Sequence, residues 1–482
     1  MDEEQKNVIE DNGEPEKTIG SPEIEESETI PVHPIAQTID THILRICDLR
    51  ANAFKLMKRA AESCLEELEK YKQIYEESFE ILEDNDSSEK IIVIKNILDT
   101  HVKIDRINKS ELLSDLATGH FLTLFATFDA FTGDLLTAVY AKKPELFNSL
   151  DRSMSISEML TYGNVDDIKK IILASEIEAF RRKSYLQQFQ ALENRFVLNL
   201  RKFKNWSKFV ECGQRRNLFS HCDGRVSEQY ISICNDNEFK LPEDTIVGSK
   251  LKLSTEYLFN SCNLIIEVIL KLGQTIWRKL LPQELEEADK QLISIQYDFL
   301  RQSDWRCAIM AGDYAVSLPN YASTVNSIIL MINHIIALKN CKLDDQVNKL
   351  LDSQDWSALC NDFRIAEKVL REDYDAALDI MEKIGMKGDF IDEHAYHVWP
   401  LFREFRQTEQ FLKGYKKVYG YDFATKLKEA AEESSTEAEA QISRKKEDIE
   451  TLAFGTEQEN YPTDEPQLCA APDREKCYGL KK

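Results

Sequence analysis

The stretch Glu211-Cys-Gly-Gln-Arg-Arg-Asn-Leu-Phe-Ser-His221, which continues as Cys-Asp-Gly-Arg-Val226, brings an arginine, an asparagine and a histidine close together. Arg216 and His221 stand five residues apart, with Asn217 between them, in an apolar helical setting. A guanidinium binds a phosphate through two parallel hydrogen bonds, and an imidazole moves a proton near neutral pH. The stretch therefore indicates chemistry on a phosphodiester.

The geometry of this helix bears on whether one chain can form the site alone. Asp223 and Gly224 form a turn signal, and Gly224 is well placed to end the helix, so Arg216 and His221 are expected in its last turns. Five residues correspond to about 500° of rotation, which leaves the two side chains about 140° apart around the helix axis. A site that uses both side chains is easier to build if a second copy of the helix takes part.

The chain as a whole is acidic, but the segment around this stretch is basic. Of 482 residues, 43% are hydrophobic and 30% are charged, which describes a soluble globular protein. The net charge of -24 excludes a protein whose whole surface binds nucleic acid. Residues 181–225 nevertheless carry 11 basic and 3 acidic residues. This segment is either a local anion site or a solvated helix face.

The cysteines and the apolar segments indicate a cytoplasmic protein. The 11 cysteines are scattered without a C-x-x-C pair, and several lie in apolar helical patterns, as buried reduced thiols do. The first 30 residues are acidic and lack the apolar core of a secretory signal. The most apolar run, 328–338, contains Asn333 and His334 and is too short to span a membrane. We expect no membrane partner.

Apolar periodicity predicts an all-α chain with tails at both ends. Residues 1–34 are acidic and poor in apolar positions, so a disordered tail is expected. Residues 35–283 show apolar spacings of three and four, which predict a helical bundle that includes one long helix over 165–196. The segment Phe121–Leu136 is apolar nearly all round and should run through the core of that bundle. Its carboxylate, Asp129, needs a partner there, either as a hydrogen-bonded structural acid or as a catalytic group.

Residues 284–423 are predicted to form a second domain of shorter, paired helices. Pro282 and the charged run 284–289 mark the boundary between the two domains. Asp304-Trp-Arg-Cys-Ala308 recurs loosely as Asp373-Tyr-Asp-Ala-Ala377, and an aromatic residue followed by alanine three positions later resembles the helix pairs of tetratricopeptide repeats. Residues 424–482 are rich in Glu and Ser, which predicts an exposed acidic helix and then a disordered tail.

The usual motifs of cofactor and metal chemistry are missing from the sequence. It contains no G-x-x-x-x-G-K-[ST] or G-x-G-x-x-G phosphate loop, no G-x-S-x-G elbow and no H-E-x-x-H pair. We therefore expect neither a cofactor nor a metal site.

Two segments together resemble the HEPN superfamily. Arg215–Val226, preceded by Trp206, Phe209 and Glu211, is similar to the HEPN signature helix, in which an arginine precedes a histidine by a few residues. The segment 128–136 resembles the preceding core helix of bacterial HEPN proteins. The likeness is densest over 120–280, and it departs from the expected pattern at Gln214, where an acidic residue would be typical.

The resemblance implies a helical bundle that pairs as a homodimer with its motif helices facing each other. Many members are metal-independent RNA endonucleases of toxin or antiviral-defence systems. In that role His221 would move a proton, Arg216 would stabilise the charge on the phosphorane, and Asn217 would orient the pair. Glu211 and Asp129 would support the site. The candidates for gathering the RNA backbone are Arg181, Arg182, Lys202, Lys204 and Arg215.

A second reading of the same resemblance needs no catalysis. Some HEPN domains only dimerise or bind, and here Arg216 would then form an ion pair with Glu211 while His221 would cap the helix. The C-terminal helices would bind a protein partner or inhibitor in either case. The sequence leaves an RNA endonuclease and a binding scaffold as the two hypotheses.

Overall fold

The described residues of the computed structural model are 32–84, 90–150, 154–428, 442 and 445–446. The predicted N-terminal tail, 1–34, and the predicted acidic helix and tail, 424–482, lie almost wholly outside them. Within the described residues the fold is all-α, with two isolated bridges and no strand, which confirms the predicted fold class. The chain divides into two compact units between Asn348 and Lys349.

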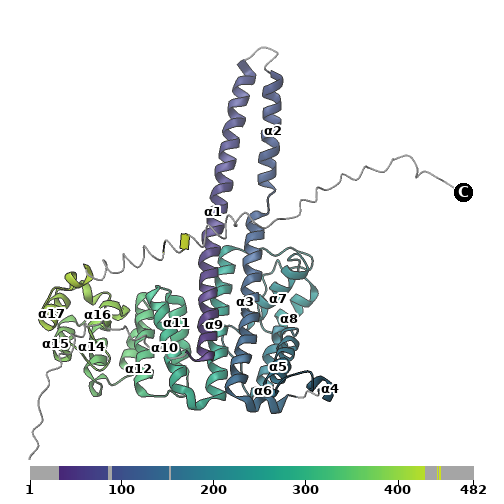
Figure 1. Cartoon of the computed structure of the whole chain (residues 1–482). Helices are drawn as coiled ribbons and strands as arrows, with labels where there is room; N and C mark the ends of the chain where they lie inside the picture. The colour runs from purple at the N-terminus through teal and green to yellow at the C-terminus, as the bar shows by residue number, and fades with distance from the viewer. Residues whose placement is uncertain (1–31, 85–89, 151–153, 429–441, 443–444, 447–482) are drawn as a thin grey trace, which may run out of the picture. The chain divides into compact units, whose positions relative to one another are not determined.

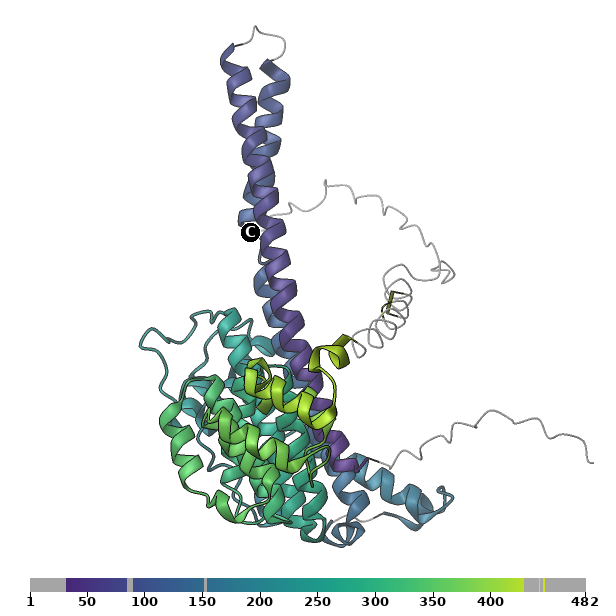
Figure 2. The ribbon, with the colours of Figure 1, turned by 90° about the vertical axis from the view of Figure 1, so that its left-hand side faces the viewer.

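Long helices form the centre of the first unit. The helix α1 packs against α2, α3 and α9, and α3 packs against α9. In Figures 1 and 2, α1 and α2 continue side by side beyond the end of the bundle. The bounds are α1 Pro34–Asp84, α2 Lys90–Asn108, α3 Leu112–Lys142 and α9 Thr255–Leu280.

The core of this bundle is the predicted apolar segment of α3. Phe121, Phe125, Phe128 and Phe131 are completely buried, which confirms that the segment runs through the core. Each such ring contributes about 1.5–3 kcal/mol of transfer free energy. By length and composition the helical stretch 90–142 could also cross a membrane. However, 61% of its 18-residue apolar segment is buried within the protein. A core helix has the same composition.

The single helix predicted over 165–196 is wrong, because the chain breaks into two helices there. The side chain of Ser184 accepts the N–H of Gln187, and the Gln187 side chain bonds back to the N–H of Ser184. This capping box starts a new helix at a point where apolar spacing alone predicts one continuous helix. The segment between α3 and α9 comprises η1 Pro144–Ser149, α4 Ile156–Met159, α5 Val165–Arg181, α6 Tyr185–Phe196, α7 Trp206–His221 and α8 Glu228–Asp236.

The first unit extends well past the predicted boundary at 283/284. The charged run that marked this boundary lies at the start of α10, where Asp289 is completely buried and bonded to Arg278 at 2.7 Å. Arg50 of α1 also forms an ion pair with Asp304, the N-cap residue of α11. These buried contacts join the later helices to α1 and α9. The elements are η2 Pro282–Glu284, α10 Leu285–Arg301, α11 Trp305–Val316, α12 Thr324–Asn340 and α13 Asp344–Asp352, the last of which spans the division.

The second unit consists of short paired helices around an aromatic core. The helices α14 and α15 pack on each other, and α15 packs on α17. Asp373 caps α15, and Ala377 one turn later is fully buried at the helix contact, as Ala308 is in α11. The elements are η3 Trp356–Ala358, α14 Asn361–Leu370, α15 Tyr374–Ile384, α16 Glu393–Val398, η4 Pro400–Phe402, η5 Phe405–Gln407 and α17 Glu409–Tyr419.

Candidate functional site

The motif lies in the last turns of α7, where the sequence places it. The helix ends at His221, and the N–H groups of Cys222 and Gly224 both bond to the carbonyl of Leu218, at 2.7 and 3.1 Å. Gly224 has a φ of +70°, and an added Cβ would meet the ring of Phe219 at 2.8 Å. Both features favour glycine at this helix stop.

Arg216 is held between two side chains and remains partly open to solvent. Its Nη1 donates to Oδ1 of Asn217 at 3.2 Å, and its Nη2 lies 3.5 Å from Oδ2 of Asp129. Asp129 also accepts the hydroxyl of Tyr185 at 3.0 Å. Burial raises the pKa of the Asp129 carboxyl, while the Tyr185 hydrogen bond and the Arg216 charge act in the opposite direction. The Arg216 side chain keeps 30% of its surface exposed, which leaves donors for a further anion.

Arg181 and Arg182, two predicted RNA-binding residues, occupy different environments. Arg181 donates from Nε to the carbonyl of Asp129 at 2.9 Å, and its guanidinium fills the space where a side chain at Gly133 would lie. It therefore fixes α5 to α3 beside the Arg216 site. Arg182 is exposed and lies 3.6 Å from Glu178, one turn earlier on the same helix.

Glu211 pairs with Arg215 and not with Arg216. The Arg215 Nε donates to Oε1 of Glu211 at 2.7 Å, and Glu211 also accepts the hydroxyls of Tyr230 and Tyr257 at 2.7 Å each. The Arg215 guanidinium lies 3.9 Å from the centre of the Tyr257 ring. Residues four apart share a helix face, whereas residues five apart do not.

This buried network changes the interpretation of both charged residues. Glu211 is 2% exposed and the Arg215 side chain is 13% exposed, so Arg215 is engaged inside the fold. Burial raises the pKa of the Tyr257 hydroxyl, and the neighbouring Cys212 and Glu211 raise it further. Glu211 and Arg215 thus join the middle of α7 to α8 and α9. The hypothetical ion pair between Arg216 and Glu211 is wrong.

His221 is exposed at the end of α7. No hydrogen bond or ion pair described for residues 32–428 involves its imidazole, so the side chain can meet a ligand. Its position relative to Arg216 follows from the helix, about 140° around the axis and about 7.5 Å along it. One copy of α7 therefore directs the two side chains to different faces.

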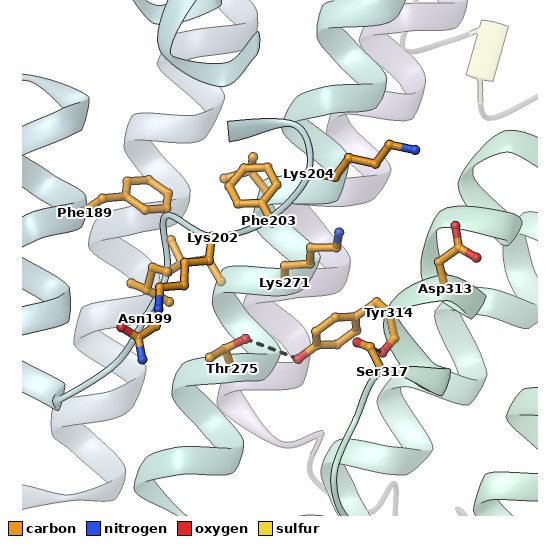
Figure 3. A pocket seen from close by; sticks show the side chains of 13 residues that line it. Phe189, Asn199, Lys202, Phe203, Lys204, Lys271, Thr275, Asp313, Tyr314 and Ser317 are labelled. Carbon is orange, nitrogen blue, oxygen red and sulfur yellow. Dashed lines mark hydrogen bonds between the residues drawn. The ribbon is translucent and has the colours of Figure 1, made fainter. Parts of the chain in front are cut away.

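Lys202 and Lys204 line a groove beside the loop that precedes α7. The groove has a volume of about 330 Å³ and lies between the 197–205 loop, α9 and α11 (Figure 3). A second hollow of about 710 Å³ continues from it and shares Lys204, Lys271 and Asp313 with it. Neither Lys202 nor Lys204 takes part in an ion pair within the described part of the chain, so both are free to attract an anion.

The larger hollow and His221 lie on different faces of α7. Lys208 and Cys212 of this helix line the larger hollow. His221 follows Lys208 by thirteen residues, which places it about 140° away around the axis. The fold therefore gathers Arg216, Asn217 and Asp129 in one place, and the hollow that Lys204 lines faces away from the histidine.

The tyrosines around the motif were not identified from the sequence. Tyr185, Tyr230 and Tyr257 come from α6, α8 and α9, and each donates its hydroxyl to a carboxylate beside α7. No local spacing links these positions, because their proximity is a product of tertiary packing. A buried carboxylate needs hydrogen-bond donors, so the sequence could indicate that donors exist but not which residues supply them.

A cluster in the second unit contains residue types that bind metals. The ligand atoms of Cys360, Asp362 and Asp389 lie within 4.8 Å of one another. However, Oδ1 of Asp362 already accepts the N–H groups of Phe390 and Ile391, at 3.0 and 2.7 Å. This buried carboxylate thus serves to fix the turn before α16.

No protein-family model, no curated protein and no solved structure matches the chain. The resemblance to HEPN domains accordingly rests on the residues of α3 and α7 alone.

Proposed function

We propose that the first unit is a metal-independent HEPN-type endoribonuclease whose site is shared between the α7 helices of two copies. One observation carries the proposal: Arg216 is oriented by Asn217 and Asp129 yet partly open, while the imidazole of His221 stands exposed in the last turn of the same helix. These are the two groups that phosphodiester cleavage needs. Their separation around one helix favours two copies.

The chemistry uses the nucleophile that RNA itself supplies. His221 takes the proton of a 2′-hydroxyl, and that oxygen attacks the adjacent phosphorus. Arg216 stabilises the negative charge that builds on the phosphorane oxygens. The bond from phosphorus to the 5′-oxygen breaks, and the departing oxygen takes up a proton. The products are a 2′,3′-cyclic phosphate and a 5′-hydroxyl.

Asp129 acts in this scheme as a positioning residue. Its carboxylate faces one side of the Arg216 guanidinium at 3.5 Å and is itself held by the Tyr185 hydroxyl. The guanidinium therefore enters the reaction already oriented, which removes part of the entropic cost of organising the transition state.

The test is cleavage of a single-stranded or structured RNA by the purified full chain in the presence of a chelator. Wild-type protein is expected to cut, and His221→Ala is expected to abolish cutting with an unchanged thermal unfolding curve. An RNA with a single deoxyribose at the cleavage position should resist, because it lacks the nucleophile. Equal cleavage by wild type and His221→Ala would sink the assignment.

The remaining parts of the proposal concern setting and partners. A cytoplasmic location is supported by the cysteines of the described residues, all nine of which are free thiols. The second unit would bind a protein partner or inhibitor through its paired helices. The proposed role as a toxin or antiviral effector rests on the resemblance to HEPN proteins.

A binding scaffold is the second candidate, and one feature of the fold favours it. The outer face of α2 exposes large apolar side chains, among them Ile91 and Val102, as interaction surfaces do. This candidate predicts a stable oligomer, no RNA cleavage under any condition, and tolerance of His221→Ala in cells.

A further inference from the structure

The helix α2 has an uncovered apolar stripe. Ile91, Ile94, Leu98 and Val102 are 73%, 46%, 60% and 65% exposed. Their spacings of three, four and four residues place them along one side of the helix. Single exposed apolar side chains are ordinary, whereas a continuous row marks a contact surface.

The opposite side of α2 already has its partner. Val93 and Thr100 are buried against α1, and the ammonium of Lys103 lies 5.2 Å from the centre of the Tyr71 ring of α1. The helix thus has two apolar sides, of which the hairpin with α1 covers only one. In Figures 1 and 2 the outer side of the α1–α2 hairpin projects beyond the bundle, where the other helices of the unit do not cover it.

The charges beside the stripe are self-complementary. Lys95 and Asp99 follow one edge of the stripe, whereas Asp105, one turn beyond Val102, already pairs with Lys109 of the same chain. In an antiparallel pair centred between Ile94 and Leu98, Lys95 stands near Asp99 of the partner subunit. By the same two-fold symmetry, Asp99 stands near Lys95 of the partner subunit.

We propose that α2 pairs with α2 of a second copy of this chain, antiparallel and about a two-fold axis. The two stripes then cover each other, with Ile91 opposite Val102 of the partner subunit, and opposite charges meet along the edge that carries Lys95 and Asp99. An isologous contact of this kind requires one surface to match itself, and the spacing of Lys95 and Asp99 about the centre meets that requirement. The acidic residues beside the stripe and the net charge of -24 disfavour an anionic lipid surface as the occupant. The proposal is independent of RNA cleavage. The antiparallel pair directs the two bundles to opposite ends of the hairpins (Figures 1 and 2), so this contact is a different one from the pairing of α7 helices proposed above.

Charge reversal at one edge tests the pairing. Lys95→Asp and Asp99→Lys are made separately, and the mass of the full chain is measured by sedimentation at low salt. Each single variant juxtaposes like charges across the axis and is expected to halve the mass of the assembly, with a dissociation constant raised at least tenfold. The exposed Lys70 of α1 supplies the matched control: Lys70→Asp makes the same charge change away from the stripe and should leave the mass unchanged.

Two combinations of these variants distinguish a loss of pairing from simple damage to the helix. The double variant Lys95→Asp/Asp99→Lys regains complementary charges within a homodimer. An equimolar mixture of the two single variants regains complementary charges only between different chains. The double variant and the mixture are therefore both expected to recover the wild-type mass. A monomeric wild type at tens of micromolar, or single variants that lose mass without recovery in either combination, would overturn the proposal. Binding of a different protein to the stripe, without binding of a second copy of this chain, would also overturn the proposal.

Discussion

Replacement of Arg215 by methionine separates a structural role of this residue from a role in binding RNA. The Arg215 guanidinium is bonded to Glu211 inside the fold and lies over the ring of Tyr257. Arg215→Met keeps much of the volume but leaves the Glu211 carboxylate, 2% exposed, without its counter-charge. Loss of one partner from a buried ion pair costs about 3–5 kcal/mol.

The expected loss converts into a measurable shift of the melting temperature. For a unit of roughly 300 residues, an unfolding entropy of about 2.1 cal/mol/K per residue turns this cost into a decrease of roughly 5–8 °C. Calorimetry and circular dichroism follow the transition. Arg182→Met is the matched control, because its ion pair with Glu178 is 81% and 70% exposed. Such a surface pair contributes at most about 1 kcal/mol.

Two outcomes would refute this reasoning. Equal melting temperatures for Arg215→Met and Arg182→Met would mean that the buried network contributes nothing. An unchanged melting temperature with weakened RNA binding in Arg215→Met would return Arg215 to the substrate-binding residues. The double variant Glu211→Gln/Arg215→Met removes both charges and is expected to recover part of the lost stability.

Two further predictions concern α1 and the end of α7. Burial raises the pKa of Asp40 to about 6 from 3.8, so its contribution to stability is fully present below pH 3.8 and is lost as the pH rises through 6. Asp40→Asn should therefore be more stable than wild type at pH 8, by at most about 3 kcal/mol, and gain nothing at pH 4; an equal gain in urea unfolding at both pH values would contradict this. Gly224→Ala forces a Cβ against Phe219 at a φ of +70° and should cost at least about 1 kcal/mol in the same assay, whereas no loss would mean that the helix stop tolerates a side chain.

Local patterns were sufficient for the elements that carry the motif. Apolar spacing located the buried row Phe121–Phe131 of α3, because a helix that is apolar on most sides has to be covered. The turn residues after His221 predicted the end of α7, because glycine adopts the positive φ found at Gly224 more readily than other residues do.

Tertiary contacts were beyond the reach of those patterns. The break before Ser184 depends on a reciprocal cap with Gln187, which apolar periodicity does not register. The charged run 284–289 resembles a linker in sequence, yet it delivers Asp289 to a buried ion pair with an arginine of another helix. The partners of Glu211 come from α8 and α9, so composition around the motif carries no sign of them.

Complementation between two inactive variants tests the shared site most directly. Arg216→Ala keeps the histidine and His221→Ala keeps the arginine, and each alone is expected to be inactive. When equal amounts are mixed and allowed to exchange, half of the dimers combine one copy of each, and one of their two sites is intact. RNA cleavage should then return to about a quarter of the wild-type rate, with 2′,3′-cyclic phosphate ends. A mixture that stays as inactive as its components, while subunit exchange is demonstrated, would contradict a site built from two α7 helices.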